Sequence, residues 1–161
     1  VWNTAMERRA DTLWEHAAAI QDVVFSPDEA LLVAGGTDGI IRLWDVESFE
    51  ALAELNYDGL ESMAFRPDGT ALVSADARTV RLWDLQSGEA LVDLQGFSGG
   101  IVSVALSPDG GTAAAASWGG IALWNTTLGW PLSSLRGLNS VVNQVAFSPD
   151  GTLLALVTGR I

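Results

Sequence analysis

The sequence predicts an all-β protein built from four tandem repeats of short strands. A five-residue turn motif recurs four times, as FSPDE at 25–29, FRPDG at 65–69, LSPDG at 106–110 and FSPDG at 147–151. A tryptophan recurs between these turns, at Trp2, Trp44, Trp83 and Trp124, with spacings of 42, 39 and 41 residues. A fixed period of this length is typical of repeat architectures.

Each repeat contains four expected strands, here called a, b, c and d in chain order. The segment IQDVVF at 20–25 alternates with period two and is rich in β-branched residues, as expected for strand a. Ser-Pro-Asp-Gly then supplies type I turn chemistry, because proline presets φ at the second turn position and glycine closes the turn. The segments ALLVAGG, IIRLWDV and ALAEL follow as strands b, c and d. No stretch has a sustained helical period.

A Trp-Asp dipeptide marks strand c of the repeats. It is present at Trp44-Asp45 and Trp83-Asp84, with Trp-Asn variants at Trp124-Asn125 and Trp2-Asn3. Together with the four Pro-Asp turns and His16, these dipeptides resemble the WD-repeat β-propeller family over essentially the whole chain. The resemblance implies four-stranded antiparallel blades in a partial wheel. We expect three whole blades at 20–55, 60–94 and 101–135, the end of a preceding blade at 1–14 and a partial blade at 142–161.

Such an arc would have open blade edges at both ends, and open edges invite pairing. We therefore expect the chain to be an excerpt of a longer propeller, or to self-associate through these edges. The alternative is an arc that closes on itself, in which residues 158–161 and 1–3 jointly form one strand c.

The family resemblance also implies a buried polar network. In that family a histidine in the d–a turn bonds an aspartate in the b–c turn, and a strand-b hydroxyl and the strand-c tryptophan complete the network. The first unit has His16, Asp38 and Trp44, but Ala34 or Gly36 stands where the hydroxyl is expected.

The other three units are expected to abandon this network, although Trp83 and Trp124 keep their structural position on strand c. In the second unit the d–a turn is two residues shorter, and Ala77 stands at the aspartate position with Asp76 one place earlier. In the third unit Phe97 replaces the histidine and Trp118 replaces the aspartate. These two aromatic residues form either a local packing pair or an exposed binding anchor.

The composition excludes several classes of function. The chain has 20 acidic and 8 basic residues, giving a net charge of −12, so nucleic acid and anionic membrane surfaces are disfavoured partners. The absence of cysteine and lysine excludes thiolate and Schiff-base chemistry, and a single histidine excludes a histidine-rich metal site. We expect no cofactor, no metal and, because cysteine and a signal segment are missing, a cytoplasmic location.

No catalytic residue is predicted, and the chain is not expected to be an enzyme. Most acidic residues have structural assignments in the Pro-Asp turns, after the strand-c tryptophan or on the outer strand d. Asp22, Asp58 and Glu61 lie near the d–a turns and recur in no pattern.

The favoured function is a non-catalytic scaffold that binds a protein or peptide partner on the face formed by the d–a and b–c loops. Large aromatic residues and arginine dominate binding hot spots. The candidate contacts are therefore Tyr57, Arg78, Phe97, Trp118 and Arg160. Two alternatives are the sensor or regulatory arm of a larger signalling enzyme or ATPase, and, less favoured, a glycan-binding propeller.

Overall fold

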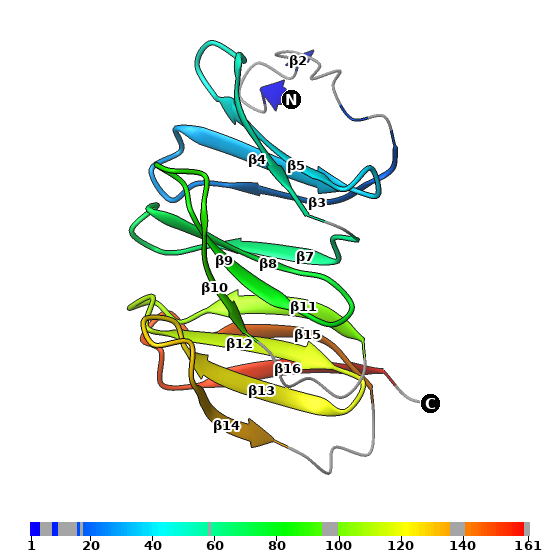
Figure 1. Cartoon of the computed structure of the whole chain (residues 1–161), viewed down its shortest axis with the longest axis vertical. Helices are drawn as coiled ribbons and strands as arrows, with labels where there is room; N and C mark the ends of the chain where they lie inside the picture. The colour runs from blue at the N-terminus through cyan, green and yellow to red at the C-terminus, as the bar shows by residue number, and fades with distance from the viewer. Residues whose placement is uncertain are drawn as a thin grey trace.

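A computed structural model of the chain shows an all-β fold in residues 1–3, 8–9, 16, 18–57, 59–94, 100–135 and 141–159, the residues that the structure describes (Figure 1). The chain begins with a two-stranded sheet of β1 (Trp2–Asn3) and β2 (Arg8–Arg9). The first four-stranded sheet contains β3 (Ile20–Phe25), β4 (Leu31–Gly36), β5 (Ile40–Asp45) and β6 (Ala51–Asn56).

The next two four-stranded sheets repeat this arrangement. The second contains β7 (Ser62–Phe65), β8 (Ala71–Ala75), β9 (Val80–Asp84) and β10 (Ala90–Leu94). The third contains β11 (Ile101–Leu106), β12 (Thr112–Ser117), β13 (Gly120–Asn125) and β14 (Pro131–Leu135). A two-stranded sheet of β15 (Val141–Phe147) and β16 (Leu154–Gly159) follows. Strands within each sheet pair antiparallel in chain order, which confirms the predicted class of four-stranded antiparallel blades.

The pairing of strands c and d has the same register in every unit. Each strand-c tryptophan lies opposite the residue seven positions later, as in Trp44↔Ala51, Trp83↔Ala90 and Trp124↔Pro131. Trp2 lies opposite Arg9 with the same spacing. The β1–β2 pair is therefore equivalent to strands c and d of the whole blades.

The hydrophobic core lies between neighbouring blades. One cluster joins Val33, Ile41, Leu43 and Leu55 of the first blade to Leu60, Met63, Leu72 and Trp83 of the second. Similar clusters join the second blade to the third, and the third to β15 and β16. Contacts between successive a strands run from β3 to β7, from β7 to β11 and from β11 to β15, so these four strands lie side by side along one wall.

The described strands form an open arc. β16 pairs with β15 and β1 pairs with β2, and β1 and β16 are far apart along the long axis of Figure 1. The structure therefore does not show the self-closed arrangement in which the two chain ends share one strand. Leu55 and Leu94, at the ends of strands d, are 4% and 1% exposed because the next blade covers them. The equivalent Leu135 is 44% exposed.

Aspartate side chains fix both kinds of tight turn. In the a–b turns, the carboxylate of Asp150 accepts hydrogen bonds from the Ser148 hydroxyl and the Thr152 backbone N–H, and these bonds lower the pKa of Asp150 to about 2. In the c–d turns, Asp45 and Asp84 each accept backbone N–H bonds from residues two and three positions later. Asn125 accepts the same pair of bonds through its amide oxygen, which explains why the Trp-Asn variant keeps the turn.

Candidate interaction surface

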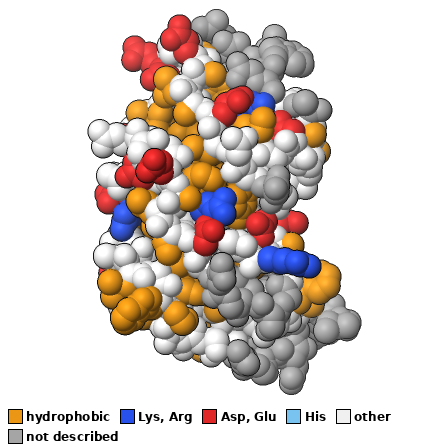
Figure 2. All heavy atoms as spheres, viewed as in Figure 1, with side chains coloured by type: hydrophobic (Ala, Val, Ile, Leu, Met, Phe, Trp, Pro, Cys, Tyr) orange, Lys and Arg blue, Asp and Glu red, His pale blue; other side chains and the backbone are white. Residues whose placement is uncertain are grey.

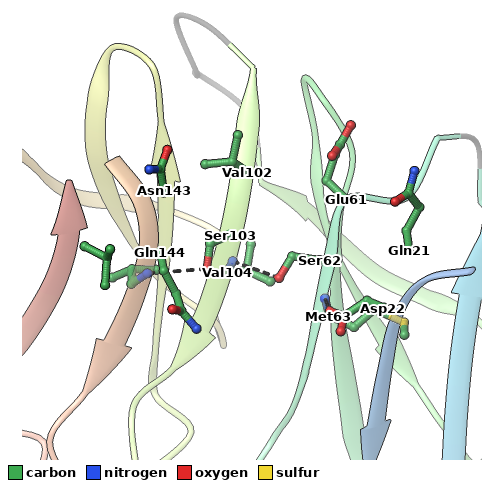
Figure 3. A pocket seen from close by; sticks show the side chains of 12 residues that line it. Gln21, Asp22, Glu61, Ser62, Met63, Val102, Ser103, Val104, Asn143 and Gln144 are labelled. Carbon is green, nitrogen blue, oxygen red and sulfur yellow. Dashed lines mark hydrogen bonds between the residues drawn. The ribbon is translucent and has the colours of Figure 1, made fainter. Parts of the chain in front are cut away.

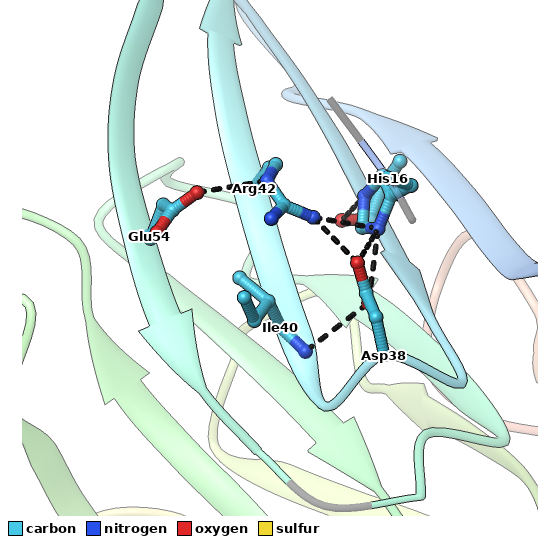
Figure 4. Close-up of polar contacts among 6 residues, drawn as sticks. His16, Asp38, Ile40, Arg42 and Glu54 are labelled. Atoms are coloured by element: carbon cyan, nitrogen blue, oxygen red, sulfur yellow. Dashed lines mark hydrogen bonds and ion pairs between the residues drawn. The ribbon is translucent and has the colours of Figure 1, made fainter. Parts of the chain in front are cut away.

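The polar network predicted for the first blade is present and includes an arginine that the sequence interpretation missed (Figure 4). Nδ1 of His16 lies 3.0 Å from Oδ2 of Asp38, and Nη1 of Arg42 donates to the same oxygen at 2.8 Å. Arg42 also donates from Nε to Oε1 of Glu54 at 2.8 Å. The side chains of His16, Asp38 and Arg42 are 7%, 9% and 8% exposed, so the opposite charges of Asp38 and Arg42 compensate each other in a buried site.

The tautomer of His16 follows from its two neighbours on either side of the ring. Nε2 lies 3.3 Å from the backbone oxygen of Ala34, and a carbonyl oxygen only accepts, so Nε2 carries the hydrogen. In the neutral ring Nδ1 then accepts from Arg42 at 2.9 Å, whereas a proton on Nδ1 would be donated to Asp38. The ring also packs on Trp44, with 5.9 Å between ring centroids. These contacts give His16 a structural role.

The second blade keeps half of the network, which corrects the prediction that it is abandoned there. Nε1 of Trp83 donates to the hydroxyl of Ser74 at 2.8 Å. Ser74 lies two residues beyond Leu72, the cross-strand neighbour of Trp83. Ala34 has the same position relative to Trp44, and Ala115 has it relative to Trp124. Among the three blades, the hydroxyl position is therefore occupied by serine in the second and by alanine in the first and third.

Tyr57 is a core residue, not the exposed contact that its loop position predicts. Its side chain packs edge-on to Trp83, with 5.9 Å between ring centroids, and its hydroxyl donates to the backbone oxygen of Thr79 at 2.9 Å. Arg81 covers both rings, and only 3% of Tyr57 is exposed. Burial raises the pKa of the Tyr57 phenol, with a further contribution from the charge of Asp76. The shorter d–a turn places Tyr57 against Trp83 as His16 is placed against Trp44.

Two of the remaining candidate contacts are exposed on neighbouring b–c turns. Trp118, in the third blade, is 69% exposed, so it is not a buried member of a packing pair. Arg78 is exposed in the second blade, where Asp76 accepts its backbone N–H and fixes the turn. Phe97 and Arg160 lie outside the described residues. Trp124 is 2% exposed and occupies the same core position as Trp44 and Trp83.

A polar cavity of about 410 Å³ opens on the inner wall of the arc, near the d–a and b–c turns (Figure 3). Two rows of equivalent positions, at the start of the four a strands or directly before it, line the cavity. The outer row consists of Gln21, Glu61, Val102 and Asn143, and the inner row consists of Asp22, Ser62, Ser103 and Gln144. Met63, Val104, Val145 and Val157 complete the lining.

Hydrogen bonds between blades recur behind this cavity. The side chains of three of the four inner-row residues accept the backbone N–H of a residue on the next a strand: Asp22 from Met63 at 2.6 Å, Ser62 from Val104 at 3.3 Å and Ser103 from Val145 at 3.4 Å. Asp22 therefore does belong to a recurrent pattern, in contrast to the sequence interpretation. Aspartate and serine share the position, and only their common capacity to accept a hydrogen bond reveals the repeat.

A second exposed feature lies at the opposite ends of the strands. Leu128 and Trp130 in the last c–d turn are 60% and 68% exposed, and Leu132 on β14 is 54% exposed. Figure 2 shows hydrophobic side chains gathered at the lower left, near the turns of the third and fourth units. Trp130 thus provides an exposed tryptophan away from the d–a and b–c turns.

Neither a metal centre nor a helical membrane span is found in the part of the chain that the structure describes. No group of three or more histidine, cysteine, aspartate or glutamate residues there could hold a metal ion. The same residues contain no helix of the length and hydrophobicity that crossing a bilayer requires.

The blades, their repeated c–d register and the turn aspartates define a repeat protein of the β-propeller class. The family described as WD domain, G-beta repeat matches residues 8–45, 53–84, 88–125 and 129–160. The chain belongs to this WD40 repeat family, as the resemblance in the sequence implied. Membership indicates a protein-interaction propeller.

Curated relatives share part of the chain. Periodic tryptophan protein 2 of Arabidopsis thaliana is 37% identical over 78 residues, which are 47% of this chain and 9% of that protein. Eukaryotic translation initiation factor 3 subunit I of Aspergillus fumigatus is 34% identical over 74 residues, 45% of this chain and 22% of that protein. MST50-interacting protein 11 of Pyricularia oryzae is 35% identical over 66 residues, 40% of this chain and 21% of that protein. The matches thus span less than a quarter of each of these relatives.

Proposed function

We propose that the chain is a non-catalytic interaction module that binds a protein or peptide partner on the face formed by its d–a and b–c turns. The observation that supports this face is the exposure of Trp118 and Arg78 on the b–c turns of adjacent blades. Tryptophan and arginine are the residue types enriched at binding hot spots, and a rigid scaffold reduces the entropy lost when they bind.

The rigid part of the module lies directly beneath these turns. Val80, Leu82 and Ile121 are at most 2% exposed, and the neighbouring b–c turns connect strands that pack into the inter-blade core. Exposed loop residues held by such a core are where recognition normally occurs.

The test compares two tryptophans of equal exposure. Peptides are selected from a random display library on the immobilised chain, and their affinities are measured by fluorescence anisotropy. Trp118→Ala should weaken binding at least tenfold, as expected for a hot-spot residue, and Arg78→Ala should weaken it less. Trp130→Ala removes a tryptophan that is 68% exposed, against 69% for Trp118, and should leave affinity unchanged. Equal losses from Trp118→Ala and Trp130→Ala, or a loss from Trp130→Ala alone, would contradict the proposed face.

A further inference from the structure

We infer that the polar cavity on the inner wall receives an arginine side chain of the partner. This inference rests on the proposed function, because the cavity opens on the same face, and it adds the chemical class of the group that is recognised. The lining contains two carboxylates, Asp22 and Glu61, and no arginine, lysine or histidine.

The two carboxylates differ in how far their hydrogen-bonding capacity is used. Asp22 accepts from the backbone N–H groups of Val23 and Met63, so its charge is held in a fixed position on the wall. Glu61 makes no side-chain hydrogen bond or ion pair with any described residue, and it is exposed at the rim of the cavity. Glu61 is therefore the carboxylate that can form a new ion pair, and Asp22 adds a negative potential behind it.

Neutral acceptors surround these charges. The side chains of Gln21, Asn143 and Gln144 also lack hydrogen-bond partners among the described residues, and Figure 3 shows them projecting from β3 and β15. Ser103 is 7% exposed, and its hydroxyl oxygen accepts from Val145 while its own O–H has no acceptor among the described residues. A guanidinium carries five N–H donors in a planar fork, so it can donate to several separate oxygens at the same time.

The walls suit the aliphatic part of the same side chain. Val102, Val104 and Met63 lie between the polar groups, and methylene groups of a long basic side chain pack favourably on such apolar surface. The volume of about 410 Å³ falls in the range of roughly 300–1,000 Å³ that is usual for ligand sites. Charge, acceptors and apolar walls together favour arginine over a neutral or acidic residue.

The experiment uses the 161-residue chain and four capped pentapeptides, Gly-Gly-Xaa-Gly-Gly, in which Xaa is arginine, citrulline, lysine or glutamate. Citrulline has nearly the shape of arginine but no charge. Binding is measured by NMR titration, with the backbone amides of Ser103 and Asn143 as reporters. The arginine peptide should shift the resonances of these amides and bind about tenfold more tightly than the citrulline peptide. The lysine peptide should have an intermediate affinity, and the glutamate peptide should not bind.

Two charge-neutralising variants test the residues. Glu61→Gln should weaken the arginine peptide about three- to fivefold, and Glu47→Gln, a change on an exposed c–d turn, should have no effect. Equal affinity for arginine and citrulline, or no effect of Glu61→Gln, would overturn the inference. The proposed function and the arginine site can be refuted independently. If the affinity of the selected peptides depends on Trp118 but not on Glu61, the proposed face is supported and the arginine site is refuted.

Discussion

The indole of Trp83 donates a hydrogen bond to the hydroxyl of Ser74, and both residues are buried, at 5% and 0% exposure. Neither group has access to water that could replace the bond. The pair lies under the b–c turn that carries Arg78, so it connects the interior of the second blade to the proposed binding face.

Ser74→Ala should lower the free energy of unfolding by about 1–3 kcal/mol, because it leaves the Trp83 N–H buried without its partner. Urea unfolding followed by tryptophan fluorescence measures this change. Ser133→Ala, at an exposed serine on β14, is the control and should change stability by less than about 0.5 kcal/mol. A Ser74→Ala variant as stable as the parent chain would contradict the importance of the bond.

The network of the first blade should show a rank order. Asp38→Ala leaves the buried Arg42 guanidinium without that carboxylate and should cost about 3–5 kcal/mol. His16→Ala should cost only about 1–2 kcal/mol, because Arg42 still pairs with Asp38. Chemical denaturation of both variants tests the order, and a larger loss for His16→Ala would refute it.

Backbone strain at one turn gives a stabilising prediction. Glu29 has a φ of 64°, whereas Gly69, Gly110 and Gly151 occupy the same position in the other three turns. Glu29→Gly should therefore raise the free energy of unfolding by about 0.5–1 kcal/mol, since the left-handed conformation costs a non-glycine residue about 1–2 kcal/mol and glycine loses more entropy on folding. Gly69→Ala is the reciprocal change and should be destabilising. Thermal unfolding measures both, and destabilisation by Glu29→Gly would count against the strain.

Acid should destabilise the turns. Hydrogen bonds lower the pKa of Asp150 from the ordinary 3.8 to about 2 in the folded chain. A lowered folded-state pKa contributes stability above the unfolded pKa, and this contribution is lost as the pH falls through the folded value. The stability difference between the parent chain and Asp150→Asn should therefore be constant above about pH 5 and shrink between about pH 4 and pH 2. Urea titrations at a series of pH values test this, and a pH-independent difference would refute it.

The open edge of the arc should promote association of the 161-residue chain. β16 pairs on one side only, and Leu135 is exposed where its equivalents are buried. Light scattering should detect species larger than a monomer, with binding of a hydrophobic dye. Leu135→Lys should reduce association, and Leu52→Lys, at a leucine that is 56% exposed on β6, should reduce it less. A dye-negative monomer would contradict the prediction.

The strands and turns could be predicted from the sequence because their signals are local. Pro-Asp motifs and period-two alternation each act within one repeat, and the tryptophan spacing sets the length of the repeat. The position of Tyr57 could not be predicted, because a turn shortened by two residues moved it from the expected rim to the core. The cavity was also missed, because Glu61 and Asn143 line one cavity only when strands from separate repeats lie side by side. Arg42 and Arg81 were detectable, since each lies 12 residues before the acid that it pairs with, Glu54 or Asp93.

The hydrogen bonds that Asp22, Ser62 and Ser103 accept from the next a strand limit how such a chain can lengthen during evolution. One full period carries one acceptor, such as Ser62, and one backbone donor, such as that of Met63. Duplicating or deleting a whole period therefore keeps donors and acceptors in equal number, whatever the repeat count. A duplication whose length is not a whole number of periods would separate a donor from its acceptor. It would leave a buried backbone N–H without the side-chain oxygen that accepts from it.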